Sequence, residues 1–418
     1  MIKFEKYKLE NGLKVILNQD LTTPMVVVNV LYDVGSKDEN PDKTGFAHLF
    51  EHLMFGGSVN VPEYDTIVQK AGGENNAFTN NDITNYYVKL PAENLEAGLW
   101  IESDRMLELD FNEKSLEVQR NVVIEEFNQR YLNQPYGDSS LLLRPLAYKV
   151  HPYKWNTIGK KTEHIRDAKL KDVKDFFYTH YAPNNAILVV SGNFETENAK
   201  QLIEKWFESI PKREVKTRNL PQEPEQSQAR KQDVERDVPQ TAIYKAYHID
   251  SRTSKEYYHA DLISDILSNG RSSWFYQILV KEKQLFSEIN AYITGNIEPG
   301  LFIIHGKILP NKSIEECENA INKLVEKISK GEFSENELEK VKNRSITYKK
   351  LSLSDIVNKA TDLAYYELLG NASLINQEEE KYREISHSDI TKTAKKIFNP
   401  NNCSTLYYNK KHKDNELS

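Results

Sequence analysis

Hydrophobic and polar residues alternate at the start of the chain, and a period of two predicts β-strands. Two such runs, residues 4–9 and 13–17, flank Asn11-Gly12 and predict a hairpin with a type I′ turn, which requires positive φ angles. The run Met25–Tyr32 is almost wholly apolar, which is typical of a central strand. Further strands are predicted at residues 75–79, 84–90 and 186–190.

A helical pattern follows the third strand. From Phe46 to Phe55 every residue is apolar except His48, Glu51 and His52, and Gly56-Gly57 ends the run. This pattern predicts a mostly buried helix. Other helices are predicted at residues 62–71, 91–109, 113–133 and 198–207.

The second half of the chain repeats this order of elements. Strands are predicted at residues 241–249, 289–294, 301–309 and 404–408, with helices at 256–267 and 272–281. We therefore expect an α+β protein with two similar domains, each a mainly antiparallel sheet packed with helices. The expected division is residues 1–210, a charged linker 211–237 rich in Gln and Pro, and residues 238–418 without a His pair.

Composition narrows the class of protein. The 418 residues are 39% hydrophobic and 28% charged, with a net charge of −7, which describes a globular protein and disfavours a nucleic-acid partner. No stretch reaches the roughly 20 apolar residues of a membrane span, and the N-terminus does not resemble a signal peptide. Cys317 and Cys403 are the two cysteines, so we expect no disulfide framework and a cytoplasmic location.

The candidate chemistry lies in the helix at residues 46–55. Positions i, i+3 and i+4 share one side of a helix, so His48, Glu51 and His52 project together. Two imidazoles one turn apart can bind a divalent metal, and this spacing is the inverted zinc-protease motif H-x-x-E-H. The alternative is two core histidines and a Glu that share a helix side by chance.

A catalytic zinc usually takes three protein ligands, so a third must come from elsewhere. The pair Glu125-Glu126 follows three β-branched apolar residues in the helix predicted at 113–133. Periodicity does not decide which of the two carboxylates lies near the core, and both can belong to a solvated face.

Several motifs together resemble the M16 metallopeptidases, which include pitrilysin, insulin-degrading enzyme and the mitochondrial processing peptidase. The order of motifs and the paired layout are similar to the shorter M16B-type members. The motifs are His48-Leu-Phe-Glu-His52, Gly72-Gly73, Asn76-Ala-Phe-Thr79 with Thr84-Asn-Tyr-Tyr87, and Val122-Val-Ile-Glu-Glu126 with Asn133-Gln-Pro-Tyr-Gly137.

The resemblance implies a role for each matching residue. His48, His52 and Glu126 would bind zinc, and Glu51 would be the general base. Gln119 stands where relatives often carry a second carboxylate, so no catalytic role is transferred to it. The segment Asn75, Asn76, Ala77, Phe78 and Thr79 is similar to the family's substrate-binding edge strand; an ordinary sheet edge is the alternative.

The resemblance also shows what this chain lacks. Active relatives carry an Arg-x6-Tyr segment in the second domain, whereas Val280 and Ser287 occupy those positions here. Lys281, Lys283 and Tyr292 do not reproduce the seven-residue step. We therefore expect a zinc endopeptidase acting on peptides or unfolded segments as the zinc-bearing half of a heterodimer. A homodimer and a non-catalytic M16-like assembly subunit are the alternatives.

Overall fold

The computed structural model describes residues 1–215 and 217–411. The chain divides into two compact units, each assembled from three stretches of sequence. Unit 1 comprises Met1–Asn128, Trp155–Leu220 and Lys349–Glu378. Unit 2 comprises Gln129–Lys154, Pro221–Tyr348 and Glu379–Ser418, of which the described part ends at residue 411.

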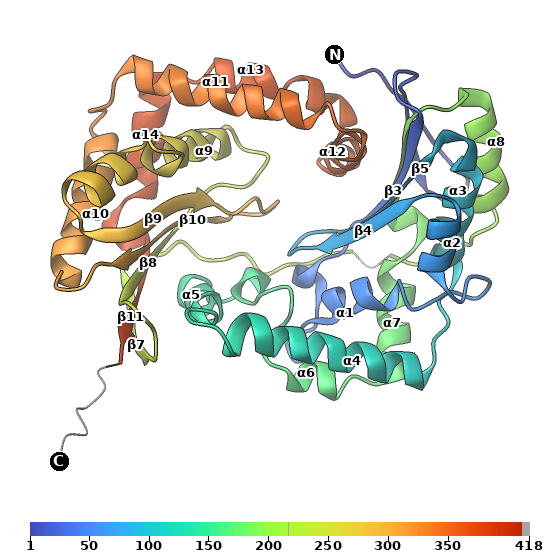
Figure 1. The fold of residues 1–418 in the computed structure, drawn as a ribbon, viewed down its shortest axis with the longest axis horizontal. Helices are drawn as coiled ribbons and strands as arrows, with labels where there is room; N and C mark the ends of the chain where they lie inside the picture. Colours follow the sequence, from blue (N-terminus) through green and yellow to red (C-terminus); the bar gives the residue numbers. More distant parts are fainter. Residues whose placement is uncertain (216, 412–418) are drawn as a thin grey trace. The chain divides into compact units, whose positions relative to one another are not determined.

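Unit 1 contains a six-stranded sheet in the order β1-β2-β6-β3-β5-β4. Figure 1 labels β3, β5 and β4 of this sheet. The β2–β6 pair is parallel and the other neighbouring pairs are antiparallel. Strand β3 is buried from Val26 to Tyr32, as its apolar run predicts for a central strand. The strands are β1 (Glu5–Lys8), β2 (Lys14–Gln19), β3 (Met25–Tyr32), β4 (Glu74–Thr79), β5 (Thr84–Pro91) and β6 (Ala186–Gly192).

The turn between β1 and β2 is not the predicted type I′ turn. Gly12 has a φ of 94°, but Asn11 does not have the positive φ that this turn also requires. The Asn11 amide instead donates to the backbone carbonyls of Phe207 and Ile210, at 2.7 and 3.0 Å. The prediction was wrong because these long-range contacts, rather than the local turn preference, fix Asn11.

Helices cover both faces of the first sheet. Helix α3 packs on the face that carries Val28 and Val88, and helix α12 packs on the face that carries Val27 and Leu31. Helix α4 is followed by a π-helical turn at Asn128–Leu132, so the helix predicted at 113–133 changes type near its end. The helices of unit 1 are α1 (Phe46–Leu53), α2 (Tyr64–Lys70), α3 (Leu95–Leu107), α4 (Glu113–Phe127), α6 (Glu163–Arg166), α7 (Leu170–His180), α8 (Thr196–Phe207) and α12 (Ile356–Leu368).

Unit 2 contains a five-stranded sheet in the order β7-β11-β8-β10-β9. Its β7–β11 pair is parallel and the others are antiparallel, so it repeats the pattern of β2-β6-β3-β5-β4 in the first sheet. The predicted α+β class with two similar units is therefore confirmed. The strands are β7 (Arg230–Arg236), β8 (Ala242–His248), β9 (Phe286–Ile293), β10 (Leu301–Ile308) and β11 (Cys403–Lys410).

Helices also pack on both faces of the second sheet. Helix α5 and the segment after it contact one face, and α9, α10 and α14 belong to the core on the other face. A π-helix spans Phe275–Glu282, where an ordinary helix was predicted. The helices are α5 (Ser139–Ala147), α9 (Lys255–Ser268), α10 (Ile314–Ser329), α13 (Glu378–Arg383) and α14 (His387–Ile397), and α11 (Glu335–Ser352) joins the two units.

The compact units differ from the division expected from the sequence. Residues 129–154 of the first half belong to unit 2, and residues 349–378 of the second half belong to unit 1. Amphipathic helices α5 and α12 lie in these exchanged segments, and a helical pattern does not specify which sheet its apolar face covers. The segment expected as a linker also holds β7, a charged edge strand without an apolar run.

Candidate metal centre

Helix α1 carries the predicted motif and is anchored by its apolar side. Phe46, Ala47, Leu49, Phe50 and Leu53 are buried, as the sequence pattern predicts. The opposite side carries His48, Glu51 and His52, which are all partly exposed. The helix contacts α4, α7 and strand β4. Helix α7 packs Phe176 and Phe177 against Phe50 on the apolar side, whereas α4 and β4 supply Glu126 and Thr79 to the side that carries the motif.

The side chains of His48, His52 and Glu126 converge. The Glu126 Oε2 atom lies 3.5 Å from His48 Nε2 and 3.4 Å from His52 Nε2. The two imidazole rings are nearly perpendicular, with centroids 4.8 Å apart. The side chains of His48, His52 and Glu126 are 12%, 24% and 19% exposed, so solvent reaches the group.

These distances can be tested against the geometry of zinc. Zinc binds nitrogen and carboxylate oxygen at about 2.0–2.2 Å, so two tetrahedral ligand atoms lie about 3.3–3.6 Å apart. Both measured N···O distances fall in this range, and the potential ligand atoms all lie within 4.8 Å of one another. Two imidazoles and one carboxylate also form a catalytic-type ligand set, so the residues fit a zinc ion.

The structure distinguishes the two carboxylates that periodicity left open. Glu126 is partly buried on the side of α4 that faces α1, whereas Glu125 is exposed. Gln119 is half-buried two turns before Glu126, so it shares the helix side of Glu126. The packing of α1 on α4 therefore decides which glutamate joins the two histidines.

Glu51 lies between the two histidines in sequence and is partly buried. Burial raises the pKa of its carboxyl above the ordinary value of 4.5. Hydrogen bonds from Thr79 and the attraction of His52 act in the opposite direction, while the nearby Glu126 adds to the rise. A carboxyl group in this position can accept a proton from a molecule held beside the histidines.

The predicted substrate segment forms the edge strand β4, which also supplies the Thr79 contact to Glu51. Within the described residues β4 pairs with β5 on one side and with no strand on the other. Asn75, Ala77 and Thr79 are half-buried, while Asn76 and Phe78 are exposed. The strand therefore offers a backbone edge to which an extended peptide can add.

Unit 2 shows how Val280 and Ser287, at the two substituted positions, are packed. Val280 packs against the apolar core of the unit, and Ser287 donates a hydrogen bond to the Gln240 side chain at 2.9 Å. Tyr292 is 46% exposed on β9, and Lys281 and Lys283 are exposed. Val280 carries no hydrogen-bond donor, and the Ser287 hydroxyl is engaged within its own unit.

Known proteins share this architecture and sequence. Two family models match the chain: "Insulinase (Peptidase family M16)" over residues 14–143 and "Peptidase M16 inactive domain" over residues 167–345. Zinc protease PqqE of Helicobacter pylori is 31% identical over 411 residues, or 97% of this chain and 92% of that protein. This chain belongs to peptidase family M16. The resemblance inferred from the motifs is thus confirmed, and the chain is a member of a metallopeptidase family.

A solved structure and a second curated protein extend the comparison within the M16 family. The crystal structure of a protease from Helicobacter pylori has a TM-score of 0.91 and 31% identity, over 98% of this chain and 100% of that one. The beta subunit of the mitochondrial-processing peptidase of Saccharomyces cerevisiae is 28% identical over 210 residues, or 50% of this chain and 45% of that subunit.

Among the described residues, no helix is long and apolar enough to cross a membrane.

Proposed function

We propose that this chain is a zinc-dependent endopeptidase that hydrolyses peptides or unfolded polypeptide segments. The proposal rests on the convergence of His48, His52 and Glu126 at distances that suit zinc. The carboxyl group of Glu51 lies beside them on the same helix. The names of the M16 relatives as zinc proteases support the same assignment.

Each residue of the site has a distinct role in this proposal. Zinc, when bound, lowers the pKa of a water molecule toward about 7 and polarises the scissile carbonyl. Glu51 accepts the proton of the attacking water and then donates it to the leaving amine. His48, His52 and Glu126 hold the metal. No side chain forms a covalent bond to the substrate.

We propose that the substrate binds as an added strand along the outer edge of β4. Backbone groups of Asn75, Asn76, Ala77, Phe78 and Thr79 would then provide hydrogen bonds that do not depend on the substrate's sequence. The half-buried side of β4 faces α1, which would place the peptide beside Glu51. This arrangement suits unfolded segments, because an extended peptide with unpaired backbone groups is needed to add a strand to β4.

We propose that full activity requires a second M16-like subunit. The positions that match the family's Arg and Tyr hold Val280 and Ser287, and neither side chain reproduces the donors of Arg and Tyr. The relative named subunit beta is, by its name, one part of a larger enzyme. A homodimer is one alternative. A non-catalytic assembly subunit is another, but the complete ligand set and Glu51 favour the catalytic role.

We also propose a cytoplasmic location. Cys317 and Cys403 are both buried and both free, which suits a reducing compartment. This proposal is independent of the catalytic one.

The zinc content of the purified chain tests the proposed centre. We expect one zinc per chain in the wild type and in Glu125→Ala, because Glu125 is exposed. His52→Ala and Glu126→Ala should lose the metal, because each removes one of three ligands. Wild-type zinc content in both of these variants would overturn the assignment.

A further inference from the structure

The start of helix α1 has no local cap. The first N–H groups of any helix lack partners within the helix, and a Ser, Thr, Asp or Asn at the N-cap usually satisfies them. The N-cap of α1 is Gly45, which has a φ of 92° and no side chain to accept a hydrogen bond. A Cβ atom there would lie 2.6 Å from the carbonyl oxygen of Ile158, so a side chain does not fit.

Glu39 supplies the missing cap from outside the helix. Its Oε2 atom accepts from the Gly45 N–H and its Oε1 atom accepts from the Ala47 N–H, both at 2.9 Å. The indole N–H of Trp155 also donates to Oε2, at 3.1 Å. Glu39 is only 5% exposed, so these three hydrogen bonds replace the water that would otherwise solvate its carboxylate oxygens.

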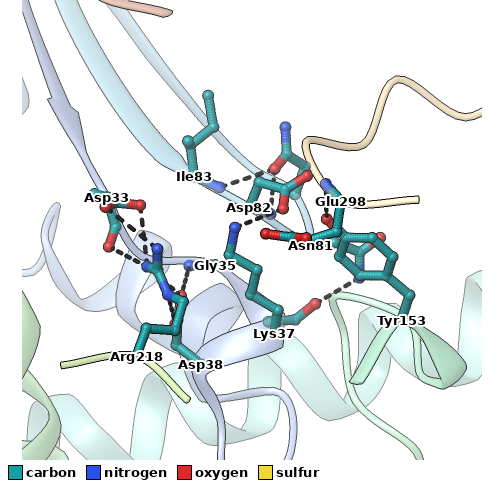
Figure 2. Close-up of polar contacts among 12 residues, drawn as sticks. Asp33, Gly35, Lys37, Asp38, Asn81, Asp82, Ile83, Tyr153, Arg218 and Glu298 are labelled. Carbon is teal, nitrogen blue, oxygen red and sulfur yellow. Dashed lines mark hydrogen bonds and ion pairs between the residues drawn. The ribbon is translucent and has the colours of Figure 1, made fainter. Parts of the chain in front are cut away.

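The loop that carries Glu39 is itself held by ion pairs. Lys37 donates to Asp82 at 2.8 Å, and both side chains are almost completely buried. Figure 2 shows Arg218, near the end of the Trp155–Leu220 stretch of unit 1, reaching Asp33 and Asp38 of this loop. The ion pairs of Asp33, Lys37 and Asp38 therefore hold the loop that positions the Glu39 carboxylate.

We propose that Glu39 is a positioning residue for the metal centre, which orients His48 and His52 by anchoring the first turn of α1. This inference rests on the proposed zinc site. The anchored Ala47 N–H is one residue before His48, and a short helix transmits a shift of its first turn to both histidines. A negative carboxylate is also favourable at the positive end of the helix dipole.

Burying the Glu39 carboxylate costs desolvation free energy, which indicates that the carboxylate has a specific role at the helix start. Burial raises the pKa of Glu39 above its ordinary value, while the hydrogen bonds from Ala47, Gly45 and Trp155 act in the opposite direction. Both oxygens accept from N–H donors, so the bonded form is the carboxylate. An ordinary N-cap hydroxyl would satisfy the helix start with less desolvation. The carboxylate adds a two-point attachment, in which its two oxygens accept from the N–H groups of Gly45 and Ala47, two residues apart, and restrict rotation of the helix start.

Glu39→Gln is the direct test. The amide keeps the shape but has one acceptor oxygen, so its NH₂ group faces a backbone N–H that is also a donor. We expect the zinc dissociation constant to rise about tenfold to a hundredfold, as for other residues that orient metal ligands. Competition with a chromophoric chelator measures the constant. The visible absorption of the cobalt-loaded chain should change as well, because ligand angles differ.

Glu367→Gln is the matched control. Glu367 is also a buried carboxylate of unit 1 that accepts a backbone N–H, from Ala372 at 3.0 Å, but it lies on α12. This variant should lose stability and keep its zinc affinity within about twofold. If Glu39→Gln does not fold, Glu39→Asp replaces it, because its shorter side chain does not reach both N–H groups at once.

The outcomes separate the two proposals. Equal zinc affinity and an equal cobalt spectrum in Glu39→Gln and Glu367→Gln would refute the positioning role. If His52→Ala, measured in parallel, also binds zinc normally, the metal site itself is misassigned. Loss of zinc in His52→Ala with unchanged affinity in Glu39→Gln would reject the positioning role alone.

Discussion

The exchange of helix α12 into unit 1 leads to a stability prediction. Leu363 of α12 is completely buried in a cluster that includes Val27, Leu31 and Val189 of the first sheet. Leu363→Ala removes most of an apolar side chain and leaves a cavity at the junction of helix and sheet. Such substitutions cost about 2–5 kcal/mol when the site relaxes only partly.

The upper half of this range is expected here, because strands on one side and a helix on the other limit collapse. For a unit of about 200 residues, each kcal/mol lowers the melting temperature by about 2–4 °C, so a fall of about 7–20 °C should follow. Urea unfolding followed by tryptophan fluorescence measures the free energy, and calorimetry measures the melting temperature.

Leu351→Ala is the matched control for this prediction. Leu351 lies in the same exchanged segment of residues 349–378, but it is 67% exposed. Its replacement should change the free energy of unfolding by less than about 0.5 kcal/mol. If Leu363→Ala costs no more than Leu351→Ala, α12 does not complete the core of unit 1 and the described packing is wrong.

Two further predictions concern the substrate and the partner. Outside the strand ladder, within the part of the chain that the structure describes, the Ala77 N–H donates only to the side chain of the neighbouring Asn76. Proline has no N–H group, so Ala77→Pro should remove one donor to a bound peptide. The KM of Ala77→Pro should rise about two- to tenfold with unchanged zinc content. The control Ala77→Ser keeps the N–H and should match the wild type. Equal KM values in both variants would exclude β4 as the edge that binds the substrate. The isolated chain should bind zinc but cleave peptides slowly, and an M16-like subunit that carries the Arg and Tyr should raise turnover by about a hundredfold. Full activity of the chain alone, undiminished when Lys281, Lys283 and Tyr292 are each replaced, would contradict the need for a partner.

Much of the fold could be predicted from the sequence because its signals are local. The apolar run Met25–Tyr32 predicts a central strand, and the repeated order of elements predicts two similar sheets. The helix with three polar residues on one side was also predictable, since its buried and exposed positions follow the helical period.

The features that escaped prediction depend on contacts between distant residues. Asn11 is fixed by carbonyls about 200 positions away, and the period of α12 does not identify the sheet that it covers. Helical periodicity did not separate Glu126 from Glu125, and only the family resemblance pointed to Glu126, because the choice depends on how α4 packs on α1. Glu39 gave no motif at all; the only sequence signal was a helix start at Gly45 without a capping side chain.

The most direct test of the proposed chemistry is the paired measurement of zinc content and peptide hydrolysis in Glu51→Gln. An amide does not accept the proton of the attacking water, and Glu51 is not among the proposed ligands. The variant should therefore retain one zinc per chain while hydrolysis, assayed with the partner subunit, falls about 10²- to 10⁴-fold. Turnover near that of the wild type, with the zinc retained, would contradict the role of Glu51 and the proposed mechanism.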